Sequence, residues 1–118
     1  YQFAWKSPVR GGQLRSMHTM DIPFVYDNVD VAKDELGTGP DRYALAAIMS
    51  GAWVAFARTG NPNHNGMANW PAYDAQRRAT MIFNTPASNV VNDPNREELA
   101  AIADARRGRS GGVGPGRG

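Results

Sequence analysis

The sequence has 118 residues, of which 42% are apolar, so it can bury one small core and a multidomain arrangement is excluded. It contains no cysteine, which excludes a disulfide scaffold, a thiolate zinc site and a cysteine nucleophile within these residues. Through position 105 the chain carries nine Lys and Arg against eleven Asp and Glu, so the formal net charge of +2 comes from a basic tail on a mildly acidic body.

The first six residues alternate between two faces, with Tyr1, Phe3 and Trp5 on one side. This period of two predicts a half-buried strand over residues 1–6, which Ser-Pro then ends. A polar loop containing glycine follows over residues 9–17. It leads to His18 and to the apolar run IPFVY, whose proline argues against a central strand.

Residues 27–39 are polar and acidic and predict a surface connection. The sequence TGPD at its end is typical of a helix start. A helix is predicted to follow and to end at Gly60 and Pro62. Its apolar residues recur at three- and four-residue spacing, so they should share one buried face: Leu45, Ile48, Met49, Trp53 and Phe56.

The next part of the chain is expected to be mostly irregular. Residues 61–69 predict a turn-rich loop, and WPAY at 70–73 predicts an extended aromatic segment that folds back as a packed flap. Residues 79–83 then predict a short strand.

A final helix is predicted after Asp93-Pro94, with acidic residues in its first turn and Arg106 and Arg107 in its last. Its apolar stripe is thin, since only Leu99 and Ile102 accompany the alanines. Residues 108–118 consist almost entirely of Gly and Arg, a composition that predicts disorder.

Three stretches resemble, in order, segments of the type-B carboxylesterases, serine hydrolases of the α/β-hydrolase fold. SMHTMDIPFVY at 16–26 is similar to the catalytic-histidine segment of that family, where an acid stands third after His. WVAFARTGNPN at 53–63 is similar to its helix-end signature, and WPAY with ATMIF to its closing loop and strand. The resemblance covers the chain from its first residue to about Asn84.

This resemblance implies an α/β fold class: the C-terminal part of an α/β-hydrolase sheet with two or three helices, incomplete as an independent fold. Residues 1–107 are then the C-terminal segment of a carboxylesterase domain, followed by the disordered tail at 108–118. The implied function is serine carboxylic-ester hydrolysis. In that enzyme the chain would supply the histidine and packing elements and be inactive alone.

His18 is the catalytic base that the resemblance implies. An imidazole can take the proton of an attacking serine hydroxyl and return it to the leaving alkoxide. Without the resemblance, a loop histidine is more often solvated or structural. Asp21 stands where Glu is commoner in the family, so any contact of that acid is expected to differ here. The serine elbow, the acid and the oxyanion donors that precede His in this fold are not found in the chain.

Other motifs favour no chemistry. GRSGG at 108–112 matches the nucleophile pattern G-x-S-x-G, but it follows His18 and lies among glycines rather than between a strand and a helix. His64 is interpreted as a turn residue, and two distant histidines without thiolates predict no metal site. The acidic stretch from Asp21 to Glu35 lacks the spacing of a calcium loop. No metal and no cofactor are expected.

The expected partners are a carboxylic ester substrate and the remainder of the esterase fold upstream. An isolated piece of a large sheet exposes strand edges and an apolar helix face, so self-association is expected. The alternative function is a non-enzymatic fragment or a binding module in which the Arg/Gly-rich tail engages a polyanion. That tail lacks interleaved aromatic residues, which argues against nucleic acid.

The sequence does not decide localisation. No apolar run approaches the roughly 20 residues that span a bilayer, so no membrane association and a water-soluble chain are expected. The sequence starts at Tyr1 within an alternating run, which suggests a fragment or a processed end. Cytoplasmic and secreted locations both remain open.

Overall fold

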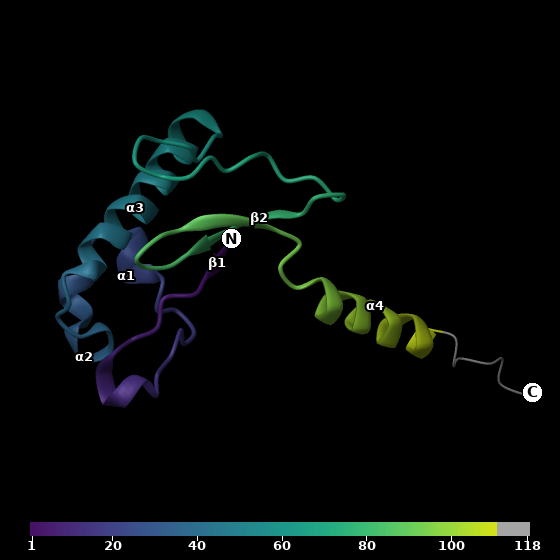
Figure 1. Cartoon of the computed structure of the whole chain (residues 1–118), viewed down its shortest axis with the longest axis horizontal. Coiled ribbons are helices and arrows are strands. Elements are labelled where there is room, and N and C mark those ends of the chain that lie inside the picture. The colour runs from purple at the N-terminus through teal and green to yellow at the C-terminus, as the bar shows by residue number, and fades with distance from the viewer. Residues whose placement is uncertain (111–118) are drawn as a thin grey trace, which may run out of the picture.

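The computed structural model describes residues 1–110. Three strands and four α-helices follow in the order β1 (Gln2–Phe3), α1 (Ile22–Val25), α2 (Lys33–Leu36), α3 (Asp41–Thr59), β2 (Ala79–Phe83), β3 (Asn89–Asn92) and α4 (Arg96–Ser110). Two short 3-10 helices, Val9–Gly12 and Val29–Ala32, lie in the connections. Figure 1 shows α1, α2 and α3 gathered on one side of the sheet, whereas α4 projects away from it.

The sheet is small and mixed. Its strand order is β1-β2-β3, with β1 parallel and β3 antiparallel to β2. Phe3 pairs with Phe83, and the Ala4 amide donates to the Phe83 carbonyl oxygen at 2.8 Å. Among residues 1–110, β2 is therefore the only strand that pairs with β1, and the other edge of β1 is unpaired.

The strand predictions were partly right. The strand over residues 79–83 is confirmed, with Ala79, Met81 and Phe83 buried on one face. The strand predicted over residues 1–6 was too long, because Trp5 turns into the core and its carbonyl oxygen accepts a hydrogen bond from Ser16 Oγ. β3 was missed, since its sequence NVVN carries only two apolar residues between turn formers.

The long central helix begins and ends where the sequence predicted. Gly60 takes a left-handed conformation, φ 76°, and its amide donates to the Phe56 carbonyl oxygen at 2.8 Å, which closes the helix. The predicted buried face was wrong in part, because Phe56 remains 59% exposed. The fully buried side of α3 is formed by Arg42, Leu45, Ala46, Met49 and Ala52.

The prediction of a mere surface connection over residues 27–39 was also wrong. This segment contains a 3-10 helix and α2, and it buries Val29 and Leu36 almost completely. Its many charges lie on the outer side, so composition concealed two core residues. Arg42 of α3 holds the segment in place: Nε donates to the Gly39 carbonyl oxygen at 2.9 Å and Nη1 to that of Val29 at 3.1 Å.

The core lies between α3 and the sheet. The Phe24 ring of α1 packs against those of Phe3 and Trp5, with centroids 5.1 and 5.2 Å apart. Such tilted aromatic pairs bury a large area with specific geometry. They position α1, and with it the turn before it, against the start of the sheet.

The final helix differs slightly from its prediction. It begins at Arg96, and Asp93 accepts a hydrogen bond from Arg96 Nε at 3.1 Å. It continues to Ser110, three residues past the boundary predicted at Arg107. Residues 111–118 of the predicted disordered tail, with the last two letters of GRSGG, lie outside the described residues.

His64 lies in the predicted loop, but its ring packs on α3. Its Nε2 lies 2.9 Å from the Ile48 carbonyl oxygen and its Nδ1 lies 2.8 Å from that of Asn65. The ring occupies the space above Gly51, where a Cβ atom would lie 2.7 Å from the imidazole Cε1. Interpreting His64 only as a turn residue was therefore incomplete, because it joins residues 61–69 to the helix.

Gly51→Ala should destabilise the chain by about 1 kcal/mol, although alanine is normally the better helix former. The new methyl group displaces the His64 ring and its contact with Ile48. Gly108→Ala is the matched control, since a Cβ there meets nothing within 4 Å and should be neutral or stabilising. Urea unfolding followed by circular dichroism measures both. Stabilisation by Gly51→Ala in the presence of His64 would contradict the packing.

Candidate functional site

His18 lies in the turn that connects the polar loop to α1. Its side chain is exposed, and within residues 1–110 its ring makes no hydrogen bond. Two overlapping backbone bonds close the turn: the Met20 amide donates to the Met17 carbonyl oxygen at 3.2 Å, and the Ile22 amide to that of Thr19 at 3.1 Å. The backbone at His18 is thus ordered while both ring nitrogens remain free to bind other groups.

The residue after His18 has an unusual backbone. Thr19 has a φ of 67°, a left-handed conformation that is costly for a β-branched side chain. Its hydroxyl donates to the His18 carbonyl oxygen at 2.6 Å. Backbone strain of this kind is concentrated at functional sites in proteins, where the surrounding bonds hold it.

Asp21, the acid that stands third after His18, contacts the beginning of the chain. The Tyr1 hydroxyl donates to Asp21 Oδ2 at 2.7 Å. The Tyr1 ring makes edge contacts with Trp53 of α3 and Phe83 of β2, at centroid distances of 4.9 and 5.7 Å. Sequence reasoning missed this pair because no local signal links residues 20 positions apart.

The environment of Tyr1 raises its pKa to about 12, first through burial and then through the hydrogen bond to Asp21 and the negative charge of that carboxylate. Between pH 10 and 12 the unfolded chain loses this proton while the folded chain keeps it. The stability due to Tyr1 is therefore present below pH 10 and is lost as the pH rises through about 12.

Tyr1→Phe should remove part of the late phenolate absorbance in an alkaline titration of the folded chain. The rest of that late component belongs to Tyr43, whose pKa is raised mainly by its hydrogen bond to Asp30. Tyr26→Phe is the control, because it removes an exposed hydroxyl that has no hydrogen bond within residues 1–110. An unchanged late component in Tyr1→Phe would show that the Tyr1–Asp21 bond does not persist in solution.

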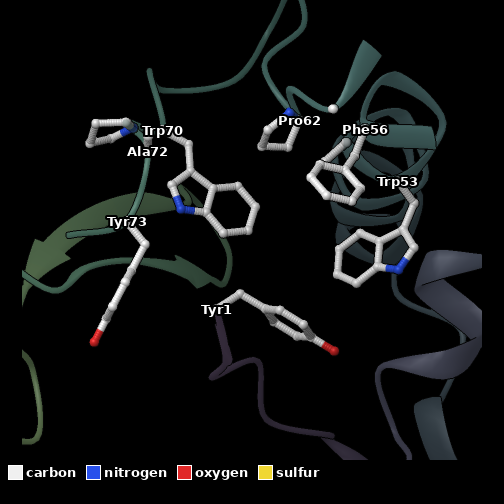
Figure 2. A pocket seen from close by; sticks show the side chains of 10 residues that line it. Tyr1, Trp53, Phe56, Pro62, Trp70, Ala72 and Tyr73 are labelled. Atoms are coloured by element: carbon white, nitrogen blue, oxygen red, sulfur yellow. The ribbon is translucent and has the colours of Figure 1, made fainter. Parts of the chain in front are cut away.

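Two apolar hollows meet at Tyr1. The first, of about 500 Å³, is lined by Tyr1, Ala52, Trp53, Phe56, Gly60, Pro62, Trp70, Pro71, Ala72 and Tyr73. In Figure 2, Trp53 and Phe56 project from α3 and face Trp70 and Tyr1 across the space. The WPAY segment thus lies extended on the other side of this hollow from α3, and its Trp70 ring packs edge-on against Phe83 with centroids 5.9 Å apart.

The second hollow, of about 490 Å³, includes Asp21 together with apolar residues of α1 and α3. His18 lines neither hollow. Within residues 1–110 no group of three or more His, Asp or Glu side chains is arranged to hold a metal ion. None of the helices in this part of the chain is long and apolar enough to cross a membrane. The structure thus gives an exposed imidazole at His18 and, separately, two apolar hollows that share Tyr1.

Residues 1–102 match the model of the carboxylesterase family. The chain belongs to this family. It is 31% identical over 106 residues to phenmedipham hydrolase of Pseudarthrobacter oxydans, which covers 86% of this chain and 22% of that protein. It is 33% identical over 102 residues to para-nitrobenzyl esterase of Bacillus subtilis, and this match covers 83% of the chain and 20% of that protein. The carboxylesterase chain thus spans about a fifth of the length of these relatives.

Solved esterases share its structure. A PNB esterase superposes with a TM-score of 0.75 at 29% identity, over 85% of this chain and 20% of that one. A carboxylesterase of Geobacillus stearothermophilus superposes with a TM-score of 0.70 at 38% identity, over 86% of this chain and 21% of that one. The predicted family is confirmed, and the small mixed sheet with its helices corresponds to part of the α/β-hydrolase fold of these enzymes.

Proposed function

We propose that this carboxylesterase chain supplies the catalytic histidine, His18, to a serine ester hydrolase whose nucleophile and acid lie outside it. The observation that carries the proposal is the exposed, unpaired imidazole on an ordered turn. A base that serves a serine needs one ring nitrogen for the hydroxyl and the other for an orienting acid. Within residues 1–110 both nitrogens of His18 are free for these two partners.

The reaction follows from this arrangement. The imidazole accepts the proton of a serine hydroxyl as its oxygen attacks the ester carbonyl, and it then protonates the leaving alkoxide. A second round with water releases the acid and regenerates the serine. Carboxylic esters are the proposed substrate class. Para-nitrobenzyl esterase is named as an esterase and phenmedipham hydrolase as a hydrolase, which supports hydrolysis of esters without choosing the ester.

The partner of the chain is proposed to be the remainder of the esterase fold. The unpaired edge of β1 can accept another strand, and the aromatic hollow between α3 and the WPAY segment can be covered by apolar side chains. About four-fifths of the length of these relatives lies outside the part that this chain matches, which is enough to do both. In isolation the same surfaces favour self-association.

A chimera tests the proposal. The segment of para-nitrobenzyl esterase that this chain matches, about a fifth of its length, is replaced by this chain. Hydrolysis of a short-chain aryl ester is measured for the chimera, for the relative without that segment and for this chain alone. We expect activity from the chimera only. Hydrolysis by the isolated chain at the rate of the chimera, or a folded chimera without activity, would contradict it.

A further inference from the structure

We propose that Tyr1 is a positioning residue for His18, acting through Asp21 to fix the turn that carries the imidazole. This inference deepens the proposed function and rests on it, since it assigns the reason why the base keeps one orientation. Tyr1 is not itself a catalytic residue, because its hydroxyl contacts Asp21 and not the His18 ring.

Asp21 connects the histidine turn to α1. Its carbonyl oxygen accepts hydrogen bonds from the amides of Phe24 and Val25 at 3.1 and 3.0 Å, so its backbone forms the start of the helix. Its carboxylate is bound to the Tyr1 hydroxyl. Met20, between His18 and Asp21, is buried in the core. If the histidine turn shifts, either the buried Met20 side chain must move or the Tyr1–Asp21 hydrogen bond must break.

The Tyr1 ring is held by two other elements. It makes edge contacts with Trp53 of α3 and Phe83 of β2, and both of these elements contribute side chains to the core. Through the hydroxyl, Tyr1 therefore connects Asp21 and the histidine turn to the sheet and to α3. This restraint matters because proton transfer requires placement within a fraction of an ångström, and a misplacement of about 1 Å can cost about a hundredfold in rate.

The turn needs such a restraint. Thr19 has a φ of 67°, and a chain with a β-branched residue in that conformation gains free energy by relaxing. The bonds within the turn oppose the relaxation locally, and the Tyr1–Asp21 bond opposes it from outside the turn. A tyrosine phenol is protonated at neutral pH and can donate there, and the raised pKa of Tyr1 extends this donor state into the alkaline range.

Amide hydrogen exchange by NMR on the 118-residue chain tests the restraint directly. Tyr1→Phe should speed exchange at the Met20 and Ile22 amides about tenfold, because local opening is measured separately from global unfolding. Exchange at Met81 in β2 should stay unchanged. Asp21→Ala should reproduce the pattern from the other side of the bond, and Tyr26→Phe should have no effect. Rates in Tyr1→Phe within twofold of wild type, or a uniform rise that includes Met81, would overturn the proposal.

The chimera provides the catalytic readout. Tyr1→Phe should lower kcat about tenfold and leave KM unchanged, since ester binding is retained while the base is misplaced. Asp21→Ala should lower kcat by the same factor, and the double variant should lower it no further, because both changes break one interaction. Asp21→Glu should retain most of the activity because it keeps the carboxylate acceptor. If His18→Ala leaves activity intact, the proposed function fails. If His18→Ala abolishes activity while Tyr1→Phe leaves kcat unchanged, only the positioning role fails.

Discussion

His18→Ala in the chimera is expected to lower kcat/KM for an aryl ester by about a thousandfold or more. Without the imidazole the serine hydroxyl attacks while still protonated, and the alkoxide leaves without a proton donor. General acid–base catalysis is typically worth about 100- to 10,000-fold, and loss of one member of a cooperating set costs nearly as much as loss of all.

The same substitution should leave stability almost unchanged. His18 is exposed and its ring has no hydrogen bond within residues 1–110, so its removal should shift the free energy of unfolding by about 0.5 kcal/mol at most. A large loss of activity with an unchanged urea midpoint would separate catalysis from folding. Replacement of His64 should have the opposite effects. Because its ring packs on α3, its loss should lower the free energy of unfolding, without a direct effect on catalysis.

Met17→Ala is the matched control for His18→Ala. Met17 lies next to His18 in the same turn and is also exposed, but it carries no group that transfers a proton. The kcat/KM of the Met17→Ala chimera should stay within about threefold of that of the unaltered chimera. Added imidazole should restore part of the rate in His18→Ala and none in other impaired variants. Activity of His18→Ala within tenfold of the parent would remove His18 from the mechanism.

Arg42→Met should cost about 2–4 kcal/mol of stability. The guanidinium is 1% exposed, and it donates to the carbonyl oxygens of Gly39 and Val29 and approaches Asp30 Oδ1 at 3.4 Å. Methionine fills most of the volume but donates nothing, so two carbonyl groups in a buried region lose their partners. The charge of Asp30 contributes less to this cost, because half of its side chain is exposed to solvent.

Arg58→Met is the matched control, since it makes the same change near the C-terminal end of the same helix at an exposed position. It should change stability by less than about 0.5 kcal/mol, the value of a cation near the negative end of the helix dipole. Arg42→Lys should fall between the two, because one ammonium cannot reproduce the planar fork of donors. Urea unfolding of the three variants measures the differences. Equal midpoints for Arg42→Met and Arg58→Met would show that Arg42 does not join residues 27–39 to α3.

Several predictions that rest on a few neighbouring residues were confirmed. The TGPD start and the Gly60 end of α3 depend on backbone conformations that Pro and Gly prefer, so its bounds followed from local chemistry. The short, mostly apolar run at residues 79–83 gave the bounds of β2. The family followed from three motifs in order, and its model matches most of the chain.

The buried side of α3 was harder to predict. Spacing identifies which residues share a face, but it does not say how the neighbouring elements are placed around the helix. Phe56 was expected in the core and remains exposed, whereas Arg42 was not considered and is buried. An arginine enters a core only where several carbonyl oxygens converge on it, and here they come from another segment of the chain.

By itself the sequence determined the family, the long helix and the central strand, because each is encoded in continuous stretches of the chain. Only the tertiary structure decided that Tyr1 binds Asp21, that His64 packs on Gly51 and that Val29 and Leu36 are buried. These contacts join residues far apart in the sequence. Their free energy depends on distances that arise after the helices and strands have packed, so no local pattern records them.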